Sequence, residues 1–514
     1  MKPKQYIIPM VTLIAALFIA TGCSKNLDTL PENRTFTGET DYTKTSDMIL
    51  PVIGAYAALS PVDVDWMDMP LIAVRGDDVN AGGLGDQIPF DDTDKYKYDK
   101  GYWMYNAFWS SYYQHMIASI SAMEQVALYK EKTASASSAA LADQYTAEVK
   151  VLKAWHLFQL SRVFGGLLIP TSSNPSALYT LPLSTKDEVM QYISDQMDEA
   201  IPLLPDLRPN QRTDIPGGVT KYTALAMKAF ANLELKKYPE VAAAAGEIIN
   251  SGKFTLESDY YNLFKLKGKL NNENLLEKQY SDFGTGSGDN YYYLYAFFGP
   301  QGWTPKVSGA GDGWGFWEPS LKYIKFMLDR GEVTRLQTTV CFTNRGIAEI
   351  QKDPKYATLP SWVSNTTLSG DVFNDYARAM FASGKHYLPS DQLTAGRTSY
   401  GTNKNFTCIR YAQMLLMYAE ALTQGASGTA GSADNAVNLV RARAGMPALT
   451  GVNNDQVMDE KFAELATEWG DRYYDMIRLG KTDQLSYDGR AFSTDKTFLP
   501  YPQAQVDILP ALQK

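Results

Sequence analysis

The sequence predicts a mainly helical protein in which paired helices form a scaffold and long irregular loops carry the functional residues. Apolar residues recur at spacings of three and four in several separate blocks, which is the period of a helix that buries one face or more. Two of these blocks have the form of a helix, a short turn and a second helix. Residues 284–319, in contrast, are rich in glycine and aromatic residues and follow no period, which is typical of a loop.

The N-terminus has the layout of a bacterial lipoprotein signal. Lys2 and Lys4 precede an apolar run from Ile7 to Ala20, which is short for a membrane span and is followed closely by Cys23. Small residues directly before a cysteine are what a lipoprotein signal peptidase needs, because the thiol of that cysteine carries the lipid. An ordinary signal peptide with an incidental cysteine is the alternative. We therefore expect residues 1–22 to be a signal peptide and Cys23 to be the lipidation site.

The rest of the chain is expected to be one body on a short tether. Residues 23–45 are polar and contain proline and glycine, which is typical of a linker. No second apolar stretch of the sequence is long enough to span a bilayer. We expect the body to cover residues 46–514, with an N-terminal half of about 46–270 and a C-terminal half of about 271–514.

Residues 141–163 predict a long helix that is buried on more than one side. Gly165 and Gly166 are expected to end it, and Pro170 follows. A first set of residues on one face is spaced by four, four, three, four and seven and consists of Leu141, Tyr145, Val149, Leu152, His156 and Val163. A second apolar set, which includes Phe158, lies on another face of the same helix.

Residues 218–256 predict two antiparallel helices separated by a turn at 236–239. Small residues between large ones let two helices approach closely, as they do in tetratricopeptide repeats. A second pair is expected at 409–423 and 433–443. One last long helix is expected to carry Phe462, Ala466, Trp469, Tyr473 and Ile477. Because the repeats are irregular in period, we expect a helical scaffold with inserted loops rather than a regular solenoid.

Residues 284–319 hold a cluster of aromatic side chains on a glycine-rich backbone with few charges, and a smaller counterpart lies at 61–109. Such a backbone can hold aromatic rings out toward solvent, and an exposed aromatic cluster usually has a partner. We expect Trp314 and Trp317 to be exposed. Four other aromatic residues are expected to pack in the core: Trp155, Tyr295, Phe297 and Trp469.

Several of these segments resemble the SusD/RagB family. Residues 152–170 (LKAWHLFQLSRVFGGLLIP) resemble its signature helix and exit turn, and residues 409–422 (IRYAQMLLMYAEAL) are the most specific match. Residues 436–447 (AVNLVRARAGMP) follow at the expected distance. Residues 464–480 (ELATEWGDRYYDMIRLG) resemble the family's acidic-aromatic helix, and residues 499–512 resemble its closing segment.

The resemblance covers essentially the whole chain from residue 23 onward, with small departures such as Gln413, where an acid is common. It implies a SusD-like fold, with tetratricopeptide-like helices and long loops. It further implies a surface lipoprotein of the Gram-negative outer membrane, not an enzyme, that captures glycan or less often peptide. The helices would pack against a SusC-like TonB-dependent barrel transporter. Two placements of the ligand site carry over: the loop around 75–80 and the aromatic loop before Pro319.

Sugar recognition gives these two loops a chemical role. A sugar ring has an apolar C–H face and a rim of hydroxyls, so aromatic planes can cover the face while Asp, Asn and Arg side chains bond the rim. Core packing is the alternative for each aromatic residue. The candidate ligand-binding residues are Trp303, Trp314, Trp317, Tyr291, Tyr292, Tyr293, Arg75, Asp77, Asp78 and Asn80.

Composition and motifs argue against other functional classes. A net charge of −9 disfavours binding to nucleic acid. Three histidines and three cysteines leave little material for a disulfide framework or a zinc cluster. No catalytic triad, phosphate loop or dinucleotide fingerprint stands out, and adjacent acids such as Asp77 and Asp78 do not suit a hydrolase pair. We expect no catalytic activity and no cofactor, while structural calcium at loop carboxylates stays open.

Two other functions stay open at this point. Peptide capture would use main-chain hydrogen bonds in a roomy cavity and would need fewer aromatic planes. A purely structural lid of the transporter would need no ligand site. The many Trp and Tyr residues in 284–319 favour sugar. Because residue order does not set the orientation of the rings, the sequence does not name the glycan.

Overall fold

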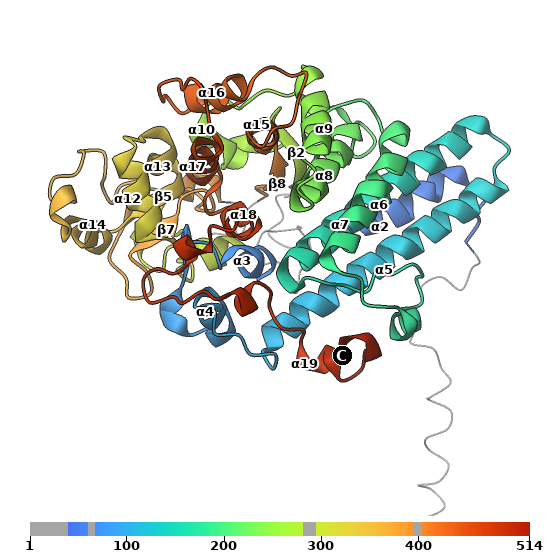
Figure 1. The fold of residues 1–514 in the computed structure, drawn as a ribbon, viewed down its shortest axis with the longest axis horizontal. Coiled ribbons are helices and arrows are strands. Elements are labelled where there is room, and N and C mark those ends of the chain that lie inside the picture. The colour runs from blue at the N-terminus through green and yellow to red at the C-terminus, as the bar shows by residue number, and fades with distance from the viewer. Residues whose placement is uncertain (1–39, 60–66, 281–293, 394–402, 514) are drawn as a thin grey trace, which may run out of the picture.

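The structure is a computed structural model that describes residues 40–59, 67–280, 294–393 and 403–513, and it is mostly helical (Figure 1). The helices of the first part are α2 (Ile49–Ala57), α3 (Asp68–Ala73), α4 (Ile88–Asp94), α5 (Trp103–Lys132), α6 (Ala136–Phe164), α7 (Lys186–Ala200), α8 (Lys221–Glu234), α9 (Tyr238–Asn250), α10 (Tyr260–Leu263) and α11 (Leu294–Phe298). Those of the second part are α12 (Leu321–Asp329), α13 (Thr334–Thr339), α14 (Asn344–Gln351), α15 (Tyr411–Thr423), α16 (Ala433–Arg443), α17 (Asn454–Leu465), α18 (Asp471–Leu479) and α19 (Gln503–Val506).

The longer helices form one continuous stack. Helix α5 packs on α6, α6 on α7, α7 on α8 and α8 on α9, and α9 then packs on α15 (Figure 1). The contact between α9 and α15 is close, because a Cβ atom built on Gly246 would lie 3.3 Å from the ring of Tyr418. This junction joins the predicted helix pair at 218–256 to the helices of the C-terminal half.

The helix predicted at 141–163 is confirmed as part of α6. It is buried over most of its second half, on more than one face, and His156 and Trp155 lie in the core as expected. Gly165 follows directly with a φ of +81°, a backbone conformation that favours glycine and ends the helix. The second predicted pair is confirmed as α15 and α16, except that α15 begins at Tyr411 because the preceding residues form a strand.

The single long helix predicted near the C-terminus is wrong, since the chain forms α17 and α18 with a break at residues 466–470. Thr467 and Gly470 both have positive φ, at +67° and +75°. A Cβ atom on Gly470 would lie 2.6 Å from the Cα of Ala73, so the break lets the chain pass close to α3. The helical period of the apolar residues continues across the break, which is why the sequence pattern did not reveal it.

Among the described residues, the strands form four antiparallel pairs that each join distant parts of the chain. The pairs are β1 (Val79–Gly82) with β4 (Phe316–Pro319), β2 (Asn274–Lys278) with β8 (Phe406–Arg410), β3 (Trp303–Thr304) with β6 (Val372–Phe373), and β5 (Val340–Phe342) with β7 (Phe381–Ser383). The described part of the aromatic stretch is therefore not the free loop that the sequence predicts, because β3, β4 and α11 lie within it.

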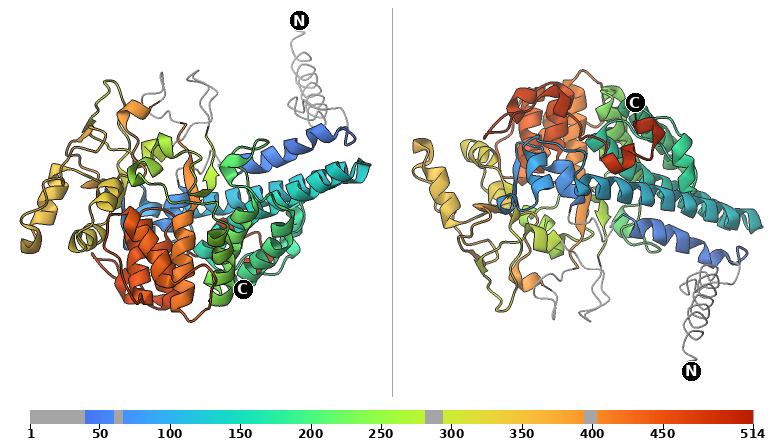
Figure 2. Two further views of the ribbon diagram at one scale, coloured as in Figure 1. Left: turned by 90° about the horizontal axis from the view of Figure 1, so that it is seen from above. Right: turned by 90° about the horizontal axis from the view of Figure 1, so that it is seen from below.

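Two groups of apolar side chains make up most of the core. The larger group runs from Met48 to Leu512 and joins the helical stack to β1, β4 and the C-terminal segments. The smaller group lies under α12, α13 and β5. Figure 2 shows that α12–α14 lie at the opposite end of the molecule from the far tips of α5 and α6. Within the described ranges, no helix has the length and apolarity that a membrane span needs.

Candidate functional site

The structure brings the two predicted ligand loops together. Strand β1 follows the loop that begins at Arg75, and β4 closes the aromatic stretch. The two strands pair antiparallel, with Val79 opposite Pro319 and Asn80 opposite Glu318. Most of the predicted side chains at this junction are nevertheless buried.

Arg75 and Asp77 are fully buried, which contradicts the expectation that they face a ligand. Arg75 donates to the carbonyl oxygen of Thr497 at 2.9 Å. Asp77 accepts a hydrogen bond from Nε of Arg472 at 2.8 Å and lies 2.6 Å from Nζ of Lys322. Burial by itself would raise the pKa of Asp77, but the two cations outweigh it and hold the pKa below its usual value. Both side chains therefore tie the N-terminal part to the C-terminal part.

Asp78 and Trp317 are also buried, and both hold the break between α17 and α18. Oδ2 of Asp78 accepts from the backbone N–H of Thr467 at 2.7 Å, and Nε1 of Trp317 donates to the carbonyl of the same residue at 3.0 Å. Burial raises the pKa of Asp78 to about 6. The expected exposure of Trp317 is wrong, because β1–β4 pairing turns its ring into the core against Phe90.

The other predicted residues have mixed outcomes. Trp303 is 7% exposed, since β3 places its ring among Phe373 and Tyr387, and this contradicts its expected role as a ligand platform. Trp314 and Asn80 are half-buried, and Asn80 accepts from Arg490 at 2.9 Å. Phe297 and Trp469 lie in the core as expected. The remaining predictions fall outside the described residues or side chains and concern Tyr291, Tyr292, Tyr293, Cys23 and the side chain of Tyr295.

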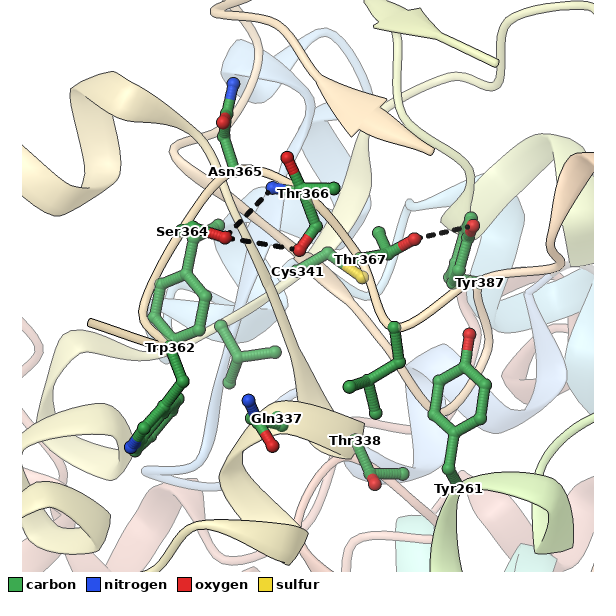
Figure 3. Close-up of a pocket in the computed structure, with 13 residues that line it drawn as sticks. Tyr261, Gln337, Thr338, Cys341, Trp362, Ser364, Asn365, Thr366, Thr367 and Tyr387 are labelled. Carbon is green, nitrogen blue, oxygen red and sulfur yellow. Dashed lines mark hydrogen bonds between the residues drawn. The ribbon is translucent and has the colours of Figure 1, made fainter. Parts of the chain in front are cut away.

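A pocket lined by aromatic, hydroxyl and amide side chains lies beside β5 in the C-terminal half (Figure 3). The sequence did not predict this pocket. It has about 410 Å³ of empty space, counting its open mouth. We call it the hydroxyl pocket. Its lining residues are Tyr261, Gln337, Thr338, Val340, Cys341, Phe342, Trp362, Ser364, Asn365, Thr366, Thr367, Leu368 and Tyr387.

The lining combines aromatic planes with uncharged hydrogen-bonding groups. Tyr261, from α10, and Trp362, from the loop before β6, supply half-buried rings, while the lining rings of Phe342 and Tyr387, from β5 and from the segment after β7, are buried. Between them stand the hydroxyl and amide side chains of α13 and of residues 364–367, and no lining side chain carries a full charge. This is the set of groups that a neutral sugar ring needs: planes for its C–H face and donors and acceptors for its hydroxyls.

The wall that follows Trp362 along the chain is a short hairpin. The N–H of Phe373 donates to the carbonyl of Asn365 at 2.8 Å, and the N–H of Thr367 donates to the carbonyl of Asp371 at 2.8 Å. Gly370 has a φ of +89° and allows the chain to turn between them. These backbone hydrogen bonds thus fix the positions of the residues that carry the hydroxyl groups of this wall.

Asp371 anchors this wall to the rest of the pocket. Its carboxylate is buried and accepts from the N–H of Lys306 at 2.7 Å, from the N–H of Ser390 at 3.0 Å and from the hydroxyl of Tyr387. A buried carboxylate bonded by several donors is costly to disturb. The hairpin wall and the Tyr387 ring are therefore held by the same side chain.

The groups behind the pocket are buried, and Lys265 among them is held by hydrogen bonds. Nζ of Lys265 lies 4.6 Å from the centre of the Tyr261 ring and donates to the carbonyls of Gly384 and Tyr387 at 2.6 and 2.9 Å. Burial lowers the pKa of Lys265 to about 7. Burial raises the pKa of the Cys341 thiol to about 12, so this cysteine stays protonated at neutral pH and is a poor nucleophile.

A signal in the sequence could have indicated this pocket. Residues 361–370 read SWVSNTTLSG, which places one tryptophan in a run of hydroxyl and amide residues without any charge. The rings of Tyr261 and Tyr387 come from distant segments, so only the fold shows that they face this run. Within the described parts of the chain, no group of three or more His, Cys, Asp or Glu side chains is placed to hold a metal ion.

Comparison with known proteins identifies the family. A model described as the SusD family matches residues 272–514, and a model described as starch-binding associating with outer membrane matches residues 87–229. The chain belongs to the SusD family. Its stack of helices is accordingly the tetratricopeptide-like scaffold of the SusD-like fold.

Individual relatives of this SusD-family protein are distant. The SusD-like protein P2 of Formosa agariphila is 24% identical over 492 residues, which is 91% of this chain and 90% of that protein. The surface glycan-binding protein A of Bacteroides thetaiotaomicron, solved with laminarihexaose, has a TM-score of 0.73 at 22% identity and covers 91% of this chain and 98% of its own. A laminarin-binding SusD-like protein has a TM-score of 0.73 at 20% identity, with coverages of 91% and 97%. At these identities the solved structures establish the shared fold.

Proposed function

We propose that this SusD-family protein captures a neutral glycan in the hydroxyl pocket and releases it unchanged. The observation that carries this proposal is the lining itself, in which four aromatic residues, two of them half-buried, surround hydroxyl and amide side chains and no charged side chain takes part. A neutral sugar can bury its C–H face on a ring and exchange its water contacts for these groups without desolvating a charge.

The relatives support this class of ligand. One solved SusD-like protein is named as laminarin-binding, and a glycan-binding protein of the same fold was solved with laminarihexaose. The pocket has no carboxylate pair and no activated nucleophile among its lining residues, which suits binding without turnover. Half-buried Trp314 is not among the residues that line the hydroxyl pocket and is the remaining candidate among the tryptophans predicted from the sequence.

Peptide capture and a structural lid are less well supported. A peptide carries charged termini and often charged side chains, and the hydroxyl pocket offers no charged lining group to pair with them. A lid without a ligand would have no need for half-buried Trp362 beside a run of hydroxyl groups.

Replacing Trp362 by alanine is expected to abolish or strongly weaken glycan binding. The test is affinity electrophoresis of the protein lacking residues 1–23 in gels that contain laminarin, soluble starch, a xylan or a mannan. Loss of one central aromatic contact costs about 2 kcal/mol, so the polysaccharide that retards the wild type should bind the Trp362→Ala variant roughly 30-fold more weakly.

Two further variants make this test decisive. Leu128→Ala changes a side chain that is 39% exposed on α5, outside the pocket, and should bind like the wild type. Trp314→Ala tests the site expected from the sequence. Loss of binding with Trp314→Ala, together with normal binding by Trp362→Ala, would place the ligand elsewhere and refute the hydroxyl pocket. Retardation of the wild type by no glycan would refute the function itself.

The cellular setting belongs to the same proposal. The sequence pattern before Cys23 supports a lipid anchor, and the family description supports association with the outer membrane. We place the protein on the outer surface, where it would pass its glycan to a SusC-like TonB-dependent transporter. The Cys23→Ser variant should lose the lipid and leave the membrane fraction, and the lipidated wild type should co-purify with the transporter. A Cys23→Ser protein that stays in the membrane fraction would refute the anchor.

A further inference from the structure

A second, larger groove lies along the first part of α5, far from the hydroxyl pocket in sequence and sharing no lining residue with it. Its floor is α5, one wall is the turn that contains Tyr179, and the other wall is α19 with the residues that follow it. Helix α19 lies beside the beginning of α5 (Figure 1). The groove has about 1220 Å³ of empty space, counting its open side, and we call it the α5 groove.

The floor of the groove is one stripe of α5. Ser110, Gln114, Ile117 and Ser121 are spaced by four, three and four residues, which places them on the same face of the helix. Trp103 lies seven residues before Ser110 and continues the stripe by two turns, about 10 Å. This tryptophan is 52% exposed, although it is a large aromatic side chain.

The lining combines uncharged polar groups like those of the hydroxyl pocket with more apolar surface. Eight of its fifteen residues carry a hydroxyl or a side-chain amide, and none carries a full charge. Tyr179 is 51% exposed at the wall, so aromatic planes stand both at the wall and at the end of the stripe. Gln505 donates to Asn106 at 2.9 Å and to Ser110 at 3.2 Å, and thereby fixes α19 against the floor.

These features favour a glycan over a protein partner. The buried centre of a protein interface is apolar and aromatic, and hydroxyl-rich serines are depleted there. The α5 groove carries serine and glutamine side chains along its floor, together with apolar side chains such as Ile117 and Ile508. A chain of neutral sugars satisfies both kinds of group along an extended groove, because every ring offers a C–H face and hydroxyls.

We infer that the α5 groove is a second site for a neutral glycan chain, so that the protein holds a polysaccharide at two separate places. This inference rests on the proposed function and extends it from a single sugar site to capture of a polymer. Two sites on one chain raise the avidity for a long glycan well above the affinity for a short one, provided that the glycan reaches both.

The test uses the double variant Trp103→Ala/Tyr179→Ala and the polysaccharide that retards the wild type most, at full length and as a hexasaccharide cut from it. Calorimetry should give two hexasaccharides per wild-type chain, one for the double variant and one for Trp362→Ala. Affinity for the full-length polysaccharide should fall about ten-fold or more in the double variant. Leu128→Ala, on the same helix but outside the groove, is the matched control.

Each outcome decides one point. Two hexasaccharides per double-variant chain, with unchanged affinity for the polymer, overturn the groove while leaving the proposed function intact. The same unchanged binding together with loss of co-purification with the transporter would make the groove a protein interface and also overturn the inference. If the wild type binds no glycan at all, the proposed function fails. Gln114→Ala removes an exposed amide from the floor without removing core packing. This variant replaces the double variant in the same measurements if the double variant does not fold.

Discussion

Replacing Arg410 by alanine is expected to lower the free energy of unfolding by about 3–5 kcal/mol, because it removes the cation that three buried carboxylates share. Arg410 is fully buried at the end of β8. Its guanidinium lies 3.0 Å from Glu273, 2.6 Å from Glu464 and 2.7 Å from Glu468. All three carboxylates are buried, so water cannot replace the lost charge.

The electrostatics of Glu464 show how much these cations contribute. Burial alone would raise its pKa, but Arg443, Arg410 and Arg335 together lower it to about 2. The network also reaches the proposed glycan site. Lys385 donates to Glu468 at 2.8 Å and lies two residues before Tyr387, which lines the hydroxyl pocket. We therefore expect the Arg410→Ala variant to lose glycan affinity as well as stability.

Urea unfolding followed by circular dichroism measures this effect. Lys132→Ala is the control, since Lys132 and its partner Glu131 are 51% and 66% exposed and such a surface pair contributes well under 1 kcal/mol. Arg410→Lys should recover only part of the loss, because an ammonium group does not reproduce the fork of the guanidinium. A loss below about 1 kcal/mol for Arg410→Ala would show that the buried network is not required for stability.

Replacing Glu318 by glutamine is expected to make the protein more stable at alkaline pH and to have little effect at acidic pH. Glu318 lies on β4 opposite Asn80 and is 7% exposed. Its Oε1 accepts from the N–H groups of Met380 and Phe381, at 2.5 and 3.1 Å. The amide oxygen of glutamine can accept the same two hydrogen bonds without carrying a charge.

The direction follows from proton linkage. Burial raises the pKa of Glu318 to about 7, above its value in the unfolded chain. Between the two pKa values the folded state binds more protons, so stability falls as pH rises through this window. The cost of ionising Glu318 in its buried site reaches about 3 kcal/mol above pH 8 and vanishes below about pH 4.5.

The measurement is the free energy of unfolding of wild type and Glu318→Gln at pH 5 and at pH 8.5. The free energy of unfolding of the variant minus that of the wild type should be about 2–3 kcal/mol larger at pH 8.5 than at pH 5. Glu131→Gln is the matched control, since solvent hydrates its exposed carboxylate in the folded and unfolded states alike. If this difference in the free energy of unfolding does not change with pH, the raised pKa of Glu318 is contradicted.

Local patterns in the sequence determined most of the scaffold. The two helix pairs, the end of α6 at Gly165 and the burial of Trp155 follow from apolar spacing and from glycine, which act within a few residues. The family resemblance rests on the same segments, because α6, α15, α16 and α18 pack against one another or against common neighbours and so constrain each other's sequences.

Long-range contacts decided which side chains meet solvent. Trp317 and Trp362 both stand in stretches without a helical period, yet β1–β4 pairing buries Trp317 at 0% exposure, while Trp362, just before the hairpin at 365–373, stays half-buried. Arg75 and Asp77 have the chemistry of ligand contacts, but partners about 400 residues away in the chain use them to join the two ends. Residue order states which groups are present, whereas the direction in which each one points depends on strand pairing and packing between segments that only the folded chain brings together.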